Sequence, residues 1–234
     1  LVSRVYWSGP HIVMIEPGTN APGKFLLDIT AGASLTFPVL HRDGRAIKSF
    51  WGDSRDHGAR LHQGVDIFAA RGTPVVAAVD GAAFAAGLGL ALACDRVVAS
   101  TAAKFSASFT GVGLAADLGI SWSLPRRVGA ARAQQLLTLG GVLDADEALR
   151  VGLVDVVVEP QRVLSTAMVE ARRFAEGPPR SLGLLKGHFA DPPCDLASAL
   201  DREVAIQTEL MDTDDYTEGI AAFTEKRRPV FTGA

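Results

Sequence analysis

The sequence predicts a layered α/β fold, and three features support that prediction. From residue 67 onward, short apolar runs alternate with longer amphipathic segments. Some of the short runs are apolar without interruption, which is typical of strands with both faces buried. The last part of the chain has helical patterns only. Strands that alternate with helices, followed by a helical tail, indicate an α/β core with a helical C-terminal region.

The individual elements of this part follow from periodicity and from helix start signals. Asp144 and Glu147 have the spacing of a capping box, with Asp144 as the N-cap and Glu147 reaching back to it. Strands are expected at 73–79 (TPVVAAV), 96–100 (RVVAS) and 153–158 (LVDVVV), and helices at 86–94, 119–128, 130–139, 144–151 and 161–176, with a C-terminal set between 179 and 226.

Residues 1–66 differ from the rest of the chain. Gly, Pro, Asp and His are scattered through short hydrophobic pieces, which predicts strands and loops without a long helix. The segment 5–16 (VYWSGPHIVMIE) suits a first pair of strands. We therefore expect a strand- and loop-rich part at 1–72, a core at 73–180 and a helical oligomerisation region at 181–234.

Composition excludes several classes of protein. The hydrophobic content of 48% is enough to bury a sizeable core. The net charge of −3 leaves no basic surface for nucleic acid. The longest uncharged apolar run, 81–94, is too short to span a membrane. Two cysteines, Cys94 and Cys194, cannot form a disulfide framework, which favours a reduced protein in the cytoplasm.

A strand enters a Gly/Ala-rich turn and then a helix in DGAAFAAGLGLALACDRVVAS (80–100). Small side chains allow a ligand to approach the backbone there, where a helix N-terminus presents free N–H groups. This segment, together with 102–137, DADEALRVGLVDVVV (144–158) and FTEKRRPVF (223–231), resembles the crotonase, or enoyl-CoA hydratase/isomerase, family over about residues 73–234. The resemblance implies a ββα spiral core, an acyl-CoA substrate without a further cofactor, and assembly into homotrimers or hexamers.

The resemblance also implies site residues. In this family two backbone N–H groups hold the thioester oxygen and stabilise the enolate formed when a proton leaves the α-carbon. The donor in the turn corresponds to Ala86. The second donor corresponds to Ala33 in TAGASL (30–35), where Ala31 and Gly32 also contact CoA.

A basic run near the C-terminus is a second candidate for contact with CoA. Lys226, followed by Arg227 and Arg228, corresponds to the place where the family has basic residues that meet the phosphates. The alternative is a solvated helix end with favourable charges for its dipole.

Departures from the family pattern point to one reaction. Hydratases of the family use two glutamates, and those positions are Gly89 and Phe109 here. Asp117 in GLAADLGIS matches an aspartate that isomerases of the family use to transfer a proton. A lone acid between Val112 and Ile120 is expected to be desolvated, which suits general acid–base catalysis. The alternative role of Asp117 is the N-cap of the following helix.

A different resemblance covers about residues 34–81. Within 49–81, the pattern R-x-H-x-G-x-D is similar to that of the lysostaphin-like zinc metallopeptidases, and His62 and Asp66 would be the zinc ligands. That family completes its site with a downstream H-x-H pair, whereas the only histidine after His62 is His188. The chain thus looks either like a chimera of two families or like a crotonase with a drifted N-terminal region.

Three functions therefore remain open. The first is an enoyl-CoA enzyme that isomerises a double bond through Asp117. The second is a zinc peptidase with an incomplete ligand set. The third is a crotonase fold that binds CoA without catalysis.

Overall fold

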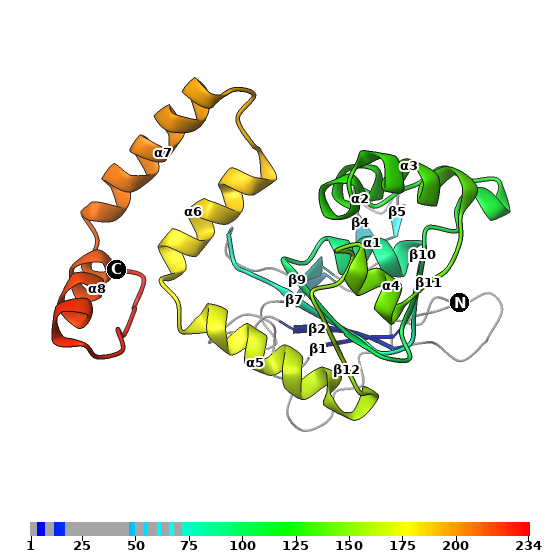
Figure 1. Ribbon diagram of the computed structural model, residues 1–234, viewed down its shortest axis with the longest axis horizontal. Helices are drawn as coiled ribbons and strands as arrows, with labels where there is room; N and C mark the ends of the chain where they lie inside the picture. Colours follow the sequence, from blue (N-terminus) through cyan, green and yellow to red (C-terminus); the bar gives the residue numbers. More distant parts are fainter. Residues whose placement is uncertain are drawn as a thin grey trace. The chain divides into compact units, whose positions relative to one another are not determined.

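The structure is a computed structural model that describes residues 72–234 in full and, before them, the backbone of six short strands between residues 4 and 67 (Figure 1). It divides into two compact units. The first comprises Leu1–Phe68 and Val75–Glu170, and the second comprises Ala69–Pro74 and Ala171–Ala234.

The first unit is built on a five-stranded sheet with the order β1-β2-β7-β9-β12. Its strands are β1 (Arg4–Trp7), β2 (Ile12–Glu16), β7 (Val76–Val79), β9 (Arg96–Ser100) and β12 (Val156–Val158). The first two form an antiparallel pair, and all later neighbours are parallel. Both the first strand pair and the three later strands predicted from the sequence are confirmed.

Four shorter strands also lie before residue 68. They form two antiparallel pairs, β3 (Ile47–Ser49) with β6 (Asp66–Ile67) and β4 (Ser54–Arg55) with β5 (Arg60–Leu61).

A three-stranded sheet accompanies the large one, in the order β11-β10-β8. Its strands are β8 (Ala82–Phe84), β10 (Lys104–Ser106) and β11 (Leu143–Asp144). The chain runs from a strand of the large sheet to a strand of the small one and then into a helix, first through β7, β8 and α1 and then through β9, β10 and α2. This repeat confirms the ββα spiral core.

The helices of the first unit are α1 (Ala86–Leu92), α2 (Ile120–Val128), α3 (Ala130–Leu139) and α4 (Ala145–Arg150), with 3-10 turns at η3 (Thr110–Val112) and η4 (Pro160–Arg162). The Asp144 carboxylate accepts a hydrogen bond from the Glu147 N–H at 2.8 Å, which confirms the predicted N-cap. The Glu147 side chain forms ion pairs with Arg132 and Arg150. The return bond expected of a capping box is therefore replaced by these ion pairs.

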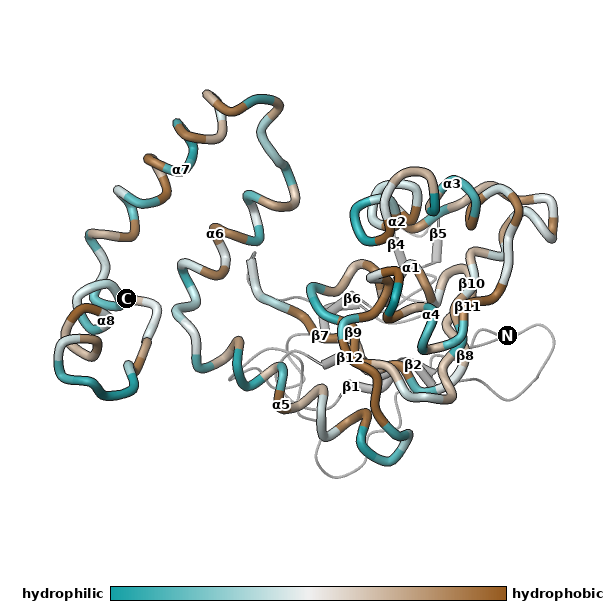
Figure 2. Tube along the Cα trace, in the orientation of Figure 1, coloured by the Kyte–Doolittle hydropathy of each residue, from teal (hydrophilic) through white to brown (hydrophobic). Residues whose placement is uncertain are grey.

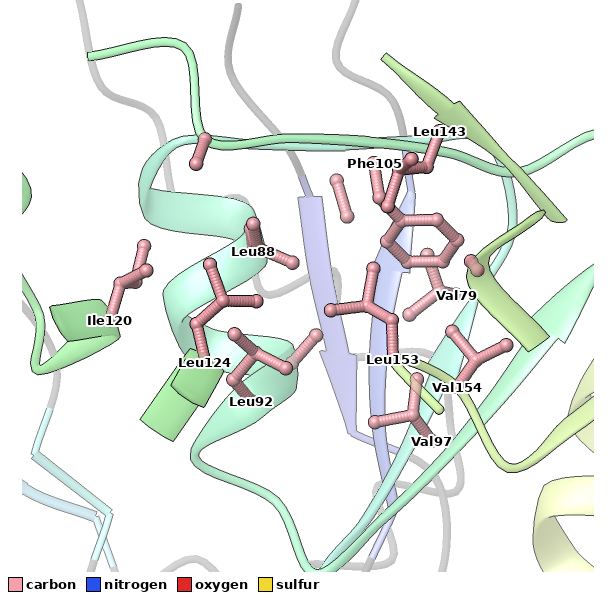
Figure 3. Packing of buried hydrophobic residues seen from close by; sticks show 14 of the residues in the cluster. Val79, Leu88, Leu92, Val97, Phe105, Ile120, Leu124, Leu143, Leu153 and Val154 are labelled. Carbon is pink, nitrogen blue, oxygen red and sulfur yellow. The ribbon is translucent and has the colours of Figure 1, made fainter. Parts of the chain in front are cut away.

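An apolar cluster joins the two sheets to α1 and α2 (Figure 3). All four residues of β7 are buried, as its uninterrupted apolar sequence predicts. Leu88 and Leu92 of α1 pack in the same cluster as Ile120 and Leu124 of α2. In Figure 2 the central strands and α1 are correspondingly brown. This packing fixes where α1 begins and how α2 lies beside it.

Two carboxylates accept hydrogen bonds from backbone N–H groups near the starts of β7 and β9. Asp95 accepts a hydrogen bond from the Val75 N–H at 2.7 Å. Asp155 accepts one from the Val97 N–H at 2.6 Å and one from the Arg127 guanidinium at 2.8 Å. These side chains satisfy backbone donors that the sheet itself leaves unpaired.

The helices α6 (Pro179–Ala190), α7 (Leu196–Met211) and α8 (Asp214–Glu225) form most of the second unit, and α5 (Val163–Ala175) leads into it. They confirm the predicted C-terminal helices. Neither α6 nor α7 contains a buried residue. Hydrophobic and hydrophilic residues alternate along both helices (Figure 2). None of the helices that the structure describes is long and apolar enough to cross a membrane.

Candidate active site

The turn between β8 and α1 holds a strained backbone. Ala85 is the N-cap of α1 with φ 47° and ψ −112°, a conformation that costs a non-glycine residue on the order of 1–3 kcal/mol. Its N–H donates to the Ser106 carbonyl of β10 at 2.9 Å, which holds the turn in place. Such strain persists only where the surrounding structure enforces it, and it concentrates at functional sites.

Ala86 is the first residue of α1, as the sequence predicted for the donor turn. The first N–H groups of a helix have no acceptor within the helix. In α1 the N–H that returns to the N-cap carbonyl is that of Gly89, which bonds to Ala85 at 3.1 Å. The Ala86 residue is exposed, and its N–H is among the first of the helix, which have no acceptor within it.

Gly89 lies one turn further along α1 and has no room for a side chain. A Cβ built on this residue would lie 2.9 Å from the Leu118 Cβ and 3.2 Å from the Ile120 Cγ1. Separations below 3.0 Å are not tolerated without movement of the neighbour. A glutamate at this position would therefore displace Leu118 and the segment around it.

Phe109 occupies the second position where hydratases carry a glutamate. It is only 5% exposed and belongs to the apolar cluster beneath α1. A carboxylate in its place would be buried without a partner, which is strongly unfavourable. The packing of this chain therefore leaves no place for a glutamate side chain at residue 89 or at residue 109.

Asp117 is placed differently from the prediction. It is exposed, so the desolvation expected from its apolar neighbours is wrong for the described structure. The alternative role as N-cap is also wrong, because the N-cap of α2 is Gly119, with φ 71°. The Asp117 carbonyl, and not its side chain, accepts the hydrogen bond from the Ile120 N–H at 3.0 Å.

Large apolar side chains surround Asp117 in the sequence and are themselves exposed. Val112, Leu114, Leu118 and Trp122 each have more than half of their surface accessible. The sequence does not show whether an apolar residue lies in the core or on the surface. Burial was therefore predicted around Asp117, where the structure has exposed apolar side chains. An exposed apolar group beside a carboxylate suits an acyl chain that brings a reactive carbon to an acid or base.

Arg126 covers one side of this exposed apolar segment. Its guanidinium carbon lies 3.2 Å from the centre of the Trp122 ring, and it donates to the Trp122 carbonyl at 2.9 Å. Sequence reasoning missed this pair, although the four-residue spacing of Trp and Arg on a helix is its signal.

Several predicted site residues lie outside the described residues or are described only by backbone. Ala31, Gly32, Ala33 and His62 belong to the former group, and Asp66 lies in β6. Within the fully described part of the chain, no group of three metal-binding side chains lies together.

Lys226 belongs to the second unit and ends α8 in a left-handed conformation, with φ 57°. The neighbouring Arg227 is bound to Glu218 and Glu225. Its hydrogen bonds, and that of the Val230 N–H, lower the pKa of Glu218 to about 2. Arg227 therefore holds the C-terminal segment against α8, whereas Lys226 is exposed.

Comparisons with known proteins give one family. The sequence matches the enoyl-CoA hydratase/isomerase family over residues 57–234. A protein named "Probable enoyl-CoA hydratase" from Rhodobacter capsulatus is 41% identical over 161 residues, which are 68% of this chain and 63% of that protein. The 1,2-epoxyphenylacetyl-CoA isomerase of Escherichia coli is also 41% identical over 161 residues, 68% of this chain and 62% of that protein.

Solved structures agree with the sequence comparison. The crystal structure of an enoyl-CoA hydratase from Bacillus anthracis aligns with a TM-score of 0.67 at 32% identity, over 70% of this chain and 64% of that one. The chain thus spans slightly less than two thirds of the length of these relatives. The comparisons by sequence and by structure give the same result: the chain belongs to the enoyl-CoA hydratase/isomerase family.

Proposed function

We propose that this protein acts on acyl-CoA thioesters and moves a carbon–carbon double bond by proton transfer, with no cofactor beyond the CoA of the substrate. Family membership supports acyl-CoA thioesters as the substrate class. The relatives include a protein named as a hydratase and one named as an isomerase, so the comparisons alone do not choose between hydration and isomerisation. The packing at Gly89 favours isomerisation. That position has no room for a side chain, and Phe109 is part of the core, so neither position of the hydratase glutamates can carry a carboxylate.

In this proposal the Ala86 N–H, together with that of Ala33, binds the thioester oxygen. Donors held by the fold stabilise the negative charge that develops on this oxygen when a carbon-bound proton leaves. The strained Ala85 turn keeps the Ala86 donor in place before the substrate arrives. Such preorganisation means that little reorganisation is needed during the reaction.

Asp117 is the proposed acid–base group. Its carboxylate takes a proton from one carbon of the acyl chain and returns it to another, so that no water is added and no oxidant is needed. Asp117 is exposed in the described structure. An acyl chain lying on Leu114 and Leu118 would cover the carboxylate and remove its water, which makes it a stronger base.

Deuterium exchange tests the assignment of Asp117. The protein would be incubated in D2O with a panel of enoyl-CoA esters, and deuteration at the α- and γ-carbons followed by NMR. We expect exchange with the unmodified protein and a loss of about 10²–10⁴-fold in Asp117→Asn, the usual contribution of a general acid or base. Asp146→Asn, another exposed aspartate, is the matched control and should retain the full rate. Equal exchange in both variants would refute the role of Asp117.

The exposure of Asp117 also favours a second candidate, a fold that binds CoA esters without catalysis. Calorimetry with the same esters separates the two functions. Micromolar binding without deuteration of any ester, unaffected by Asp117→Asn, would establish the non-catalytic binder and exclude the isomerase.

We further propose that the protein is a homotrimer, or a hexamer of two trimers, in the cytoplasm. In α7, the exposed side chains of Leu196, Leu200 and Val204 recur every four residues and so form one apolar stripe. Tyr216, Ile220 and Phe223 make a similar stripe on α8. Apolar stripes of this kind are typical of subunit contacts. The chain has only two cysteines, too few for a disulfide framework, which favours a reducing compartment.

A further inference from the structure

Among the fully described residues of the first unit, two non-glycine residues have positive φ angles: Ala85 with 47° and Leu118 with 48°. Ala85 directly precedes the proposed oxyanion donor, and Leu118 directly follows the proposed acid–base residue. Backbone strain at a bulky residue such as leucine requires a specific contact that enforces it. The Leu118 Cβ lies beside Gly89 of α1.

The contact joins the loop before α2 to the backbone of α1. A Cβ on Gly89 would approach the Leu118 Cβ to 2.9 Å, well below the carbon–carbon separation of about 3.5–4.0 Å at which packing is favourable. Leu118 thus occupies the space that any other residue at 89 would fill. Ile120, whose Cγ1 would lie 3.2 Å from the same Cβ, is completely buried, and its N–H donates to the Asp117 carbonyl at 3.0 Å.

This arrangement links the two proposed catalytic groups. Ala86 and Gly89 are three residues apart, and residues at this spacing lie on the same face of a helix, one turn from each other. Leu118 rests on Gly89, and Asp117 is its neighbour in the chain.

From this geometry, which rests on the proposed function, we propose that Gly89 and Leu118 form a positioning contact that sets Asp117 relative to the Ala86 N–H. Gly89 is then a positioning residue, because its lack of a side chain allows Leu118 to lie close to α1. Glycine is unfavourable in the middle of a helix, so its presence in α1 calls for a packing reason such as this one. A displacement of about 1 Å between reacting groups is enough to lower a rate about 10²-fold.

Three variants test the proposal. Gly89→Ala adds a methyl group that would lie 2.9 Å from the Leu118 Cβ and 3.2 Å from the Ile120 Cγ1. Leu118→Gly removes the nearer of these two contacts, and glycine adopts a positive φ without strain. The double variant combines them. Gly187→Ala is the matched control, because it adds the same methyl group to a helix where nothing lies within 4 Å.

Two measurements are made on each folded variant. The first is kcat and KM for deuteration of the enoyl-CoA ester that the unmodified protein exchanges fastest. We expect Gly89→Ala to lower kcat about 10²-fold with little change in KM and Gly187→Ala to behave like the unmodified protein. The double variant should recover part of the loss in kcat but raise KM, because Leu118 is also proposed to contact the acyl chain. A purely structural role of Gly89 would lower stability and leave kcat of the folded fraction unchanged.

The second measurement is amide hydrogen exchange at Ile120 in the ligand-free protein, which needs no catalysis. Gly89→Ala should accelerate this exchange, because the displaced loop loses the bond from Ile120 to the Asp117 carbonyl, and the double variant should restore protection. Unchanged Ile120 protection in Gly89→Ala overturns the positioning contact, as does an unchanged kcat in an active protein. Absence of deuteration with every ester would overturn the proposed function instead, and would be recognised because the unmodified protein itself is inactive.

Discussion

The proposed role of Ala86 uses its backbone and not its side chain. The contribution would be one N–H, which the family resemblance assigns to the turn that leads into α1. The strain at the preceding residue could not be predicted, because alanine gives no signal for a positive φ.

Replacement of Ala86 by proline tests this donor directly. Proline is well tolerated at the first position of a helix, where its missing N–H breaks no helical bond. We expect Ala86→Pro to fold and to lose about 10²–10³-fold in the rate of deuteration, the usual effect of removing one oxyanion donor. Ala86→Ser keeps the N–H at the same exposed position and should retain activity. Full activity and unchanged ester affinity in Ala86→Pro would contradict the assignment.

Asp117 marks the limit of sequence reasoning for single residues. The prediction of a desolvated acid relied on its apolar neighbours, but Val112 and Leu118 are themselves exposed. Hydrophobicity in a sequence does not distinguish side chains kept for a ligand from side chains kept for the core. The exclusion of two glutamates was more secure, because Gly89 and Phe109 are read directly from the sequence and their packing agrees.

At the scale of elements, length decided what could be predicted. The strands β7, β9 and β12 were found because they lie within mostly apolar segments of five to seven residues (73–79, 96–100 and 153–158), and the helices because their periodicity extends over several turns. The strands β8, β10 and β11 have only two or three residues each, too few to show a period. Their sheet is formed by tertiary pairing, and local sequence does not encode it.

The link between β9, β12 and α2 depends on one carboxylate. Asp155 bonds to the Val97 N–H and to Arg127, and its side chain is 25% exposed. Because hydrogen bonds to charged groups are stronger than neutral ones and their partners would remain unpaired, Asp155→Ala should lower the free energy of unfolding by about 2 kcal/mol. Urea denaturation measures this, with the exposed Asp201→Ala as the control. A loss equal to that of the control would show that the contact has no net effect.

At the scale of the whole molecule, the spiral core and the helical C-terminal region were predictable, because motifs in family order extend through both. The ligand side chains expected of a zinc peptidase fall among residues 62–66, where no side chain is described. That resemblance stays a prediction, although the family match beginning at residue 57 includes the same segment.

Assembly is tested by variants of the apolar stripe on α7. Leu200→Glu combined with Val204→Glu places two charges on the stripe, and we expect this variant to be monomeric where the unmodified protein is trimeric. Truncation of the chain before Ser181, which removes residues 181–234, should have the same effect. Glu203→Gln, also exposed on α7, is the control and should remain trimeric. Light scattering gives the mass, and a trimer in either altered form would refute the role of these helices.

The absence of buried residues from α6 and α7 has a thermodynamic consequence. Helices of 12 and 16 residues gain little stability in water unless a surface covers them. If that surface belongs to another subunit, then folding of this region and association are one equilibrium. Mass action then makes the melting temperature rise with protein concentration, and dilution alone unfolds the C-terminal helices while the spiral core remains.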